Sequence, residues 1–324
     1  MSYEQNAFKP GESAAVAAQM VAQEFTLAGL INHDAGNKIL EGGRKGRSIQ
    51  VKQPQALVAH GRGIDDVTNK IVLDTLAENY VDITLGVHAY SAVALSEGDV
   101  NLDIENFSEQ VLSPQAKAVA AYANDAVLNL VLAEAYAEIG AYDPANPTKF
   151  FTLLRKALRD KGVPSANLNV LAGTEVYANL LDSKAFEDAS QSGSTAALRE
   201  ASIGRVRGFT VVESVEIPET DVFAFHRDAF TLGMRAPVAP RGAAFAASVS
   251  EAGVPIRHVM DYDTDFTADR SVLSTFVGVA KMPLWKVERT QDVKTQGDAA
   301  FVAGSATVSQ VAGGAVLRVK ADAV

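Results

Sequence analysis

The 324-residue chain contains no cysteine. This absence excludes disulfide bonds, cysteine nucleophiles and zinc sites built from cysteine. The chain also lacks a phosphate-binding loop, an HExxH zinc motif and a GxSxG nucleophile elbow, and its five histidines are scattered without the spacing of metal ligands. The sequence therefore offers no candidate catalytic, cofactor-binding or metal-binding residue, and catalysis has little support.

Two short motifs resemble known signatures but lack their further residues. HRD at positions 226–228 resembles a kinase catalytic loop, which needs an asparagine five places after the aspartate, where this chain has Gly233. DYDTD at positions 261–265 resembles the start of a calcium loop, which would continue with glycine and glutamate where Phe266 and Val272 stand. The alternating carboxylates of DYDTD are better explained as the solvent face of a strand.

Long apolar runs without charge are absent, and no N-terminal segment combines a basic start with an apolar run, so membrane spanning and secretion are disfavoured. The net charge is −10, and residues 1–140 carry 9 Lys and Arg against 18 Asp and Glu. This acidic balance argues against sequence-specific recognition of nucleic acid, which relies on clustered basic residues. It allows nucleic acid to be enclosed without being gripped.

The most informative stretch spans residues 113–140. Ser113 can cap a helix, Pro114 suits its first turn and Gly140 suits its end, so the sequence predicts one uninterrupted helix. Such a helix would be roughly 40 Å long. Because Ala, Leu and Val dominate it, we expect other elements to cover most of its surface.

The N-terminal part reads as an arm that contains a helix. Residues 1–12 are polar, and residues 13–28 place apolar side chains at helical spacing, with Glu12 or Ser13 available at the start. Two interpretations remain open for this helix. It packs on its own subunit, or it crosses to a neighbouring subunit.

A long hairpin is predicted next. Strand-like runs at residues 49–58 and 67–76 flank a glycine-rich, charged tip at residues 60–66. An isolated two-stranded ribbon is marginal in water, so we expect this hairpin to lie on another copy of the chain. This region contains four basic residues, Arg44, Lys45, Arg47 and Arg62. They could contact phosphates, although solvation or pairing with acidic neighbours is the simpler interpretation.

The remainder predicts an α+β protein. Residues 81–95 alternate as a half-buried strand with Val81, Ile83, Leu85, Val87 and Ala89 on one face, and a polar connection spans residues 96–112. Later elements are predicted as helices at residues 149–161 and 174–181 and as strands at residues 168–172, 209–217, 222–225, 256–265 and 273–281. The tail after Trp285 reads as short strands, which complete the sheet of the peripheral part that contains the strand at residues 81–95 or form a small separate β unit.

The order of these parts resembles the major capsid proteins of tailed bacteriophages, which have the Hong Kong ninety-seven fold, and is nearest to the coat proteins of short-tailed Salmonella phages. The resemblance covers most of the chain. It rests on these segments in their order: GRSIQVKQPQALVAHGRGID, SPQAKAVAAYANDAVLNLVL, LNVLAGTEVYANLL, IGRVRGFTVVESVEIP and VFAFHRDAFTLGMRAP.

The resemblance implies a division of the chain into named parts. These are an N-terminal arm (1–46), an extended hairpin loop (47–80), a peripheral domain with a long spine helix (81–140), an axial domain (141–233), returning strands (234–284) and a C-terminal β segment (285–324). The inserted β-barrel domain of that branch is expected to be absent. Lys52 and Lys70 lie in the loop that some relatives crosslink, but no matching acidic catalyst is evident and no crosslink is assigned.

The resemblance also implies a function and partners. Copies of the chain would form pentamers and hexamers of an icosahedral shell, assembled in the host cytoplasm around a scaffolding protein, and would enclose double-stranded DNA in the virion. A portal protein and a decoration or minor capsid protein are further implied partners. Arg44, Lys45, Arg47 and Arg62 are the candidate contacts between subunits.

Two other interpretations remain open. An encapsulin, a bacterial compartment that loads enzyme cargo, would use the same fold. From a different class, the chain could be an enzyme whose dispersed residues converge only in the folded protein.

Overall fold

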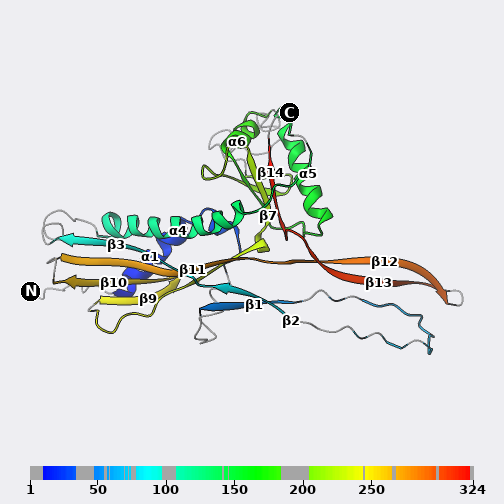
Figure 1. Cartoon of the computed structure of the whole chain (residues 1–324), viewed down its shortest axis with the longest axis horizontal. Coiled ribbons are helices and arrows are strands. Elements are labelled where there is room, and N and C mark those ends of the chain that lie inside the picture. Colours follow the sequence, from blue (N-terminus) through cyan, green and yellow to red (C-terminus); the bar gives the residue numbers. More distant parts are fainter. Residues whose placement is uncertain are drawn as a thin grey trace, which may run out of the picture. The chain divides into compact units, whose positions relative to one another are not determined.

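The computed structural model describes residues 10–33, 47–54, 57, 59–68, 70–71, 73, 78–96, 107–140, 142–144, 146–183, 204–243, 245–264, 268–296 and 299–321 (Figure 1). The chain divides into two compact units. Unit 1 consists of Met1–Val51, Asp82–Ala133 and Phe230–Lys281, and unit 2 of Lys52–Val81, Glu134–Ala229 and Met282–Val324.

Unit 1 is built on a five-stranded antiparallel sheet. Its main path runs β3 (Val87–Ser96), β11 (Ala268–Lys281), β10 (Val254–Asp263) and β9 (Phe245–Glu251), and β8 (Phe230–Arg235) also pairs with β11. The 14-residue β11 strand pairs with β10 over residues 268–274 and with β8 over residues 276–281, and β3 pairs with residues 268–277. Strand β11 is therefore the centre of this unit.

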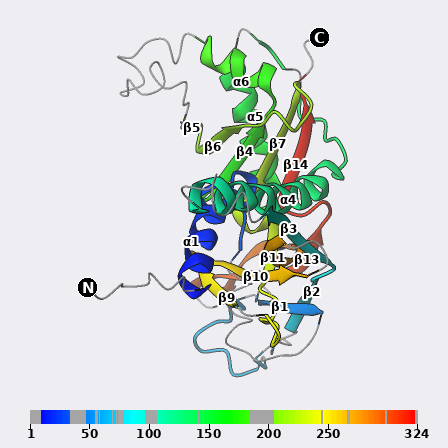
Figure 2. The ribbon, with the colours of Figure 1, turned by 90° about the vertical axis from the view of Figure 1, so that its left-hand side faces the viewer.

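Two helices, α1 (Pro10–Gln23) and α4 (Ser113–Leu132), cover one face of this sheet (Figure 2). Helix α1 contacts β9 and β10, and α4 contacts β3 and β11. In each helix the buried residues recur at helical spacing, so one stripe faces the sheet and the opposite side faces solvent. Close approach is possible because many of these buried residues are small: Ala14, Ala17, Ala18, Ala116, Ala120 and Ala123.

A buried chain of hydrogen bonds connects both helices to the strands. Gln115 of α4 donates to the carbonyl oxygens of Ser91 (3.2 Å) and Ser271 (2.9 Å), so its Oε1 must be the acceptor for the Ser271 hydroxyl at 2.9 Å. Since the Ser271 hydrogen is used there, Ser271 Oγ accepts from His258 Nε2 at 3.0 Å, and His258 Nδ1 accepts from Ser13 Oγ at 3.0 Å. The network therefore fixes His258 as the neutral Nε2–H tautomer.

The opposite face of the sheet contacts the base of a two-stranded ribbon. Strands β1 (Ser48–Pro54) and β2 (Glu78–Thr84) pair, and Ile83 and Leu85 are buried together with Val51, Phe276 and Ala280. Leu85 N donates to the carbonyl oxygen of Arg47 at 2.7 Å. This packing fixes the start and end of the loop that spans residues 55–77.

Unit 2 contains a second five-stranded sheet, ordered β14 (Val316–Lys320), β7 (Asp221–His226), β4 (Leu168–Ala172), β6 (Phe209–Glu213) and β5 (Arg205–Val206). Only β4 and β6 among these pair in parallel. Strands β4 and β7 are buried throughout, as expected for the centre of a sheet covered on both faces.

Helices α5 (Pro147–Asp160) and α6 (Thr174–Leu181) pack in this unit. The ring of Phe151 meets that of Phe209 of β6 edge-on, 6.3 Å between centroids. Before β14 the chain forms a separate two-stranded ribbon of β12 (Leu284–Gln296) and β13 (Ala299–Val311), which extends away from the sheet of its own unit (Figure 1).

The helix predicted for residues 113–140 has different ends in the structure. A π-helical turn, η2 (Ser108–Leu112), precedes α4, so Ser113 has helical dihedrals and does not cap the helix. The helix stops at Leu132, and Tyr136 instead forms a bridge with Arg318 of β14 while Ala137 N donates to Arg318 O at 2.7 Å. The prediction of an uninterrupted helix to Gly140 was wrong because pairing with β14 replaces helical hydrogen bonds. Within the single chain one side of α4 is exposed, so the expectation that other elements cover most of its surface stays a prediction.

The predicted hairpin and the strand after it were placed wrongly. The partner of β1 is β2 at residues 78–84, and the described residues among positions 67–76 form no strand. The strand expected at residues 81–95 is two strands, β2 and β3, separated by Leu85 and Gly86. This break changes the alternation, which leaves Val87 exposed although it was predicted to be buried.

Several smaller predictions also differ from the structure. The helix expected at residues 13–28 is α1 followed by the short α2 (Leu27–Leu30), and α1 packs on its own unit, as the first of the two interpretations held. The end of the polar connection at residues 96–112 is helical, and strands β8 and β9 were not predicted. In the tail, β12 and β13 are long instead of short and form a separate sheet, whereas the short β14 joins the sheet of unit 2. The predictions for residues 149–161, 168–172 and 174–181, and for the strands at residues 256–265 and 273–281, are confirmed apart from their ends; the last two are β10 and β11, which pair in antiparallel orientation.

We predict that Gly278→Ala destabilises unit 1. A Cβ at Gly278 would overlap the carbonyl oxygen of Thr84 and lie 2.9 Å from its carbon, and neither backbone can move without disturbing β11 or β2. The expected loss is about 1 to 3 kcal/mol in the free energy of unfolding, measured by urea denaturation. Gly86→Ala is the control, because nothing lies within 4 Å of a Cβ there. Equal midpoints for the two variants would contradict the prediction.

We predict that acid weakens unit 1 through His258. The side chain is 1% exposed, and burial lowers its pKa from 6.5 to about 4. Between these two values the unfolded state binds more protons than the folded state, so the free energy of unfolding falls as the pH falls from about 6.5 to 4, by about 3 kcal/mol in total. Urea denaturation at several pH values should show a shallower pH dependence for His258→Gln than for the unchanged protein. Parallel pH profiles for the two proteins would show that His258 does not cause the loss.

Candidate assembly surfaces

The loop between β1 and β2 exposes large aliphatic side chains. Five of them are more than half exposed, and Ile64 reaches 98%. We call the described residues from 57 to 73 the exposed loop; the five aliphatic residues are Leu57, Ile64, Val67, Ile71 and Leu73. Single exposed aliphatic residues are common, but several along one loop indicate a surface that another molecule covers.

The tip of the exposed loop has a defined local structure. Asp66 N donates to the carbonyl oxygen of Gly63 at 3.1 Å, which closes a turn with Ile64 and Asp65 at its centre. The backbone N and the hydroxyl of Thr68 both donate to Asp66 Oδ1, at 3.0 and 2.9 Å. These bonds hold the turn so that its two central side chains face solvent.

The four candidate contact residues are only partly covered by the structure. Arg44 and Lys45 lie outside the described residues. Arg47 is exposed next to β1 in unit 1, and Arg62 is exposed beside the loop tip in unit 2. The role of these residues in contacts between subunits stays a prediction.

The outward side of α4 is a second exposed surface. Tyr122 is 44% exposed, and the neighbouring positions on that side are small or charged residues, Lys117, Ala118, Ala121 and Asp125. Lys117 makes an exposed ion pair with Glu24, 3.6 Å between Nζ and Oε1. The sequence suggested a helix buried on most sides, and the single chain leaves this side uncovered.

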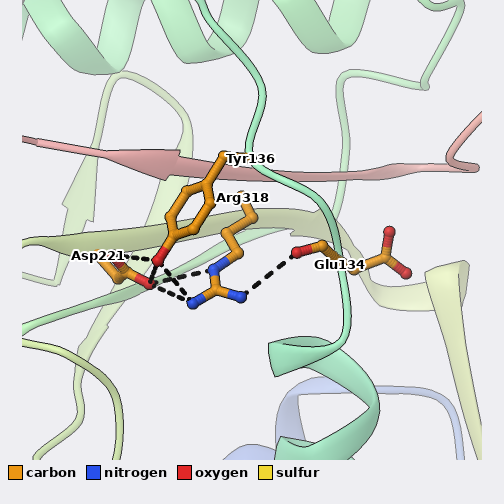
Figure 3. Close-up of polar contacts among 4 residues, drawn as sticks. All are labelled: Glu134, Tyr136, Asp221 and Arg318. Carbon is orange, nitrogen blue, oxygen red and sulfur yellow. Dashed lines mark hydrogen bonds and ion pairs between the residues drawn. The ribbon is translucent and has the colours of Figure 1, made fainter.

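Unit 2 contains a cluster of converging polar groups around Asp221, whose side chain is 0% exposed (Figure 3). Arg318 donates to Asp221 Oδ2 from Nε (3.1 Å) and Nη2 (2.8 Å), and the Tyr136 hydroxyl donates to the same carboxylate at 3.0 Å. The guanidinium also lies over the Tyr136 ring at 4.1 Å and reaches the carbonyl oxygen of Glu134 at 3.4 Å. The cluster thus attaches the chain after α4 to β7 and β14.

This cluster is structural in its chemistry. The Asp221 carboxylate is fully buried and accepts hydrogen bonds from Arg318 and Tyr136, so a substrate could not reach it. Partial burial and the hydrogen bond to Asp221 raise the pKa of Tyr136, so this hydroxyl stays protonated at neutral pH. The arrangement therefore has neither an activated nucleophile nor an available base.

Other motifs and clusters in the described residues are also structural. Asp261 and Asp263 of β10 pair with Arg270 on a strand face, as the sequence indicated for DYDTD. His226 Nδ1 accepts from the backbone N of Asp228 at 3.2 Å, which is a local turn contact. Among the described residues, no group of three or more histidine, aspartate or glutamate side chains could hold a metal ion, and no helix is long and apolar enough to cross a membrane.

Sequence reasoning missed the residues that organise these surfaces. Asp221, Arg318 and Tyr136 lie far apart in the chain, and nothing in their local sequence marks them as partners. The exposed aliphatic residues of the loop could have been found, because they stand in a glycine-rich, charged segment that cannot form its own core.

We predict that Arg318→Ala strongly destabilises unit 2. The substitution leaves the fully buried Asp221 carboxylate without its cation, which should cost about 3 to 5 kcal/mol in the free energy of opening. Hydrogen exchange of the β7 amides measures this opening separately from unit 1. Arg270→Ala is the matched control, because it removes an exposed ion pair in unit 1 and should leave β7 exchange unchanged. Unchanged exchange in Arg318→Ala would mean that the ion pair does not hold β7 and β14 together.

No protein-family model matches the chain, and no curated protein matches it. Solved structures do match.

A chain from Mycobacterium phage Che8 is 17% identical and has a TM-score of 0.56, covering 79% of this chain and 87% of that one. A chain titled as the asymmetric unit of the bacteriophage PhiM1 mature capsid is 14% identical with a TM-score of 0.47, covering 85% and 82%. A chain from Mycobacterium phage Adephagia is 12% identical with a TM-score of 0.47, covering 94% and 90%.

At these identities the similarity concerns the fold alone. The conclusion that the fold is shared rests on the Che8 chain. The mixed helix and sheet architecture predicted from the sequence is confirmed at this level. The chain therefore shares its fold, over most of its length, with a protein chain of a bacteriophage.

Proposed function

We propose that this chain is the major capsid protein of a tailed bacteriophage, which assembles with copies of itself into an icosahedral shell. The observation that carries the proposal is the exposed loop, which presents Leu57, Ile64, Val67, Ile71 and Leu73 to solvent in the single chain. Burial of one such side chain stabilises an interface by about 1.5 to 3 kcal/mol. Repeated over many subunits, these contacts supply the free energy of a closed shell.

The shared fold with a phage chain supports this proposal. The loop, the ribbon of β12 and β13 and the exposed side of α4 are all surfaces that other subunits could cover. We further propose that the copies form pentamers and hexamers. The sequence segments also suggest a relation to the coat proteins of short-tailed Salmonella phages. Unit 1 would then act as the peripheral domain with α4 as its spine, and residues 134–229 of unit 2 as the axial domain.

The further partners follow from the same proposal. A scaffolding protein would guide assembly in the host cytoplasm, a portal protein would occupy one vertex, and a decoration or minor capsid protein could bind the outer surface. Double-stranded DNA would be enclosed in the virion without sequence-specific contacts. The net charge of −10 suits this role, because an acidic protein adheres weakly to a polyanion.

Electron microscopy of negatively stained particles tests the proposal. The purified protein, expressed with its scaffolding protein, should form closed icosahedral shells. Reversing the charges of Arg44, Lys45, Arg47 and Arg62 should reduce the shell yield and its dependence on salt, if these residues pair with carboxylates of a neighbour. An unchanged yield and salt dependence would remove these four residues from the proposal.

Other outcomes of the same experiment identify the alternatives. Small uniform shells that form without a scaffold and contain a bound enzyme would indicate an encapsulin. A persistent monomer at high concentration, with the exposed loop protected from proteolysis, would contradict a shell protein and favour an enzyme with a dispersed site.

A further inference from the structure

Helix α5 of unit 2 presents a row of cations on its solvent side. Lys149, Lys156 and Arg159 follow one another at helical spacing, so they lie on the side of the helix opposite the buried Leu154. All three are exposed. Residues 147–159 contain no aspartate or glutamate, so no carboxylate within this stretch offsets their charge.

The turn between β5 and β6 adds two arginines to this row. Arg207 and Gly208 form a two-residue turn in which both have positive φ, 50° and 92°, and Arg207 is exposed. Arg155 Nη1 of α5 donates to the carbonyl oxygen of Arg207 at 2.8 Å, and a Cβ at Gly208 would overlap this nitrogen. Glycine therefore lets the Arg155 guanidinium lie against the turn. We call the five cations the basic ridge: Lys149, Arg155, Lys156, Arg159 and Arg207.

Buried contacts hold the elements that carry the basic ridge. Phe151 of α5 and Phe209 of β6 are both 0% exposed and meet edge-on, which fixes the turn beside the helix. Arg159 Nη1 donates to the carbonyl oxygen of Val163 at 2.6 Å, so this side chain is held at the end of α5. Cations on such a fixed framework lose little conformational entropy when they bind a partner.

The basic ridge has no anionic partner within the chain. Among the residues that the structure describes, none of its five cations forms an ion pair, and Arg155 and Arg159 bond to backbone carbonyl oxygens only. Arg270 and Arg318, by contrast, each pair with a carboxylate. The chain has 39 acidic residues for 29 basic ones, so the lack of pairing on the ridge does not come from a shortage of carboxylates.

The chemistry of the basic ridge suits phosphates better than a protein partner. The central part of a protein–protein interface is apolar and contains little lysine. No large apolar side chain of α5 or of the turn at Arg207 is exposed, and two of the five cations are lysines. Lysine and arginine neutralise the phosphates of nucleic acid without any apolar contact.

We propose that the basic ridge of unit 2 binds the phosphate backbone of double-stranded DNA without sequence preference. This inference rests on the proposed shell function, which brings the protein into contact with enclosed DNA, and it specifies the surface that makes the contact. From Lys149 to Arg159 the helix rises about 15 Å, which corresponds to roughly four base pairs of a duplex. Because the chain is acidic on average, the rest of the protein repels DNA and the contact is concentrated on the ridge.

Binding of the unassembled protein to a short DNA duplex tests the proposal. Fluorescence anisotropy at several salt concentrations gives the slope of log affinity against log salt, which should fall by about 2 when Lys149→Gln and Lys156→Gln are combined. The affinity of this ridge double variant should drop roughly fiftyfold at about 0.1 M salt, equally for two duplexes of unrelated sequence. Glutamine is a good helix former, so the melting temperature should not change.

A second double variant controls for net charge. Lys117→Gln combined with Arg241→Gln also removes two exposed positive charges, but both lie in unit 1, so its duplex affinity should stay close to that of the unchanged protein. Arg207→Asn tests the turn separately. Asparagine tolerates positive φ, so this variant removes one cation without new strain and should lower the salt slope by about 1.

The opposite results are equally clear. Equal losses of affinity in the two double variants would show that net charge is responsible, and the proposal would be wrong. Absence of duplex binding by the unchanged protein would also overturn it. A lower shell yield of the ridge double variant with unchanged duplex binding would make the ridge a contact between subunits instead. Duplex binding as expected, without shells from the unchanged protein, would overturn the shell function and leave the phosphate-binding surface standing.

Discussion

The hydrogen-bond chain through His258 is the interaction on which unit 1 depends. It runs from Ser13 of α1 through His258 and Ser271 to Gln115 of α4. Because these groups are buried among alanines and valines, an unsatisfied member would be costly, so the network permits one placement of the two helices on the sheet. Both helices consequently occupy the same face.

The opposite face is available to other elements as a result. The base of the β1 and β2 ribbon covers part of it around Phe276 and Ala280, where Gly278 lets the backbones approach closely. Among the described residues, the remaining part carries Arg270, which pairs with two carboxylates, and Arg257, which pairs with none. An uneven balance of charge on a fixed surface provides a basis for specific association, because it favours one partner and one register over others.

Unit 2 is held together by a buried ion pair. The Asp221 and Arg318 ion pair is buried and further bonded by Tyr136, so the chain that leaves α4 is attached to the end of β14. Both units thus hold their frameworks through buried polar contacts, while the exposed loop carries several exposed aliphatic side chains.

The sequence by itself determined those elements whose signals are local. Helix α5 follows from the spacing of Phe150, Phe151, Leu154 and Leu158, and strand β4 follows from its apolar run. The four basic residues could be singled out by charge, but charge alone does not specify which surface they meet.

Only the tertiary structure decided where α4 ends, which strand pairs with β1, and which polar residues converge. Tyr136 leaves the helix because β14, far along the chain, offers backbone partners, and Asp221, Arg318, His258 and Arg257 acquire their environments from strands that are distant in sequence. Helical periodicity and turn residues are short-range properties, whereas pairing, burial and charge balance depend on contacts between segments far apart in the chain, which no local pattern encodes.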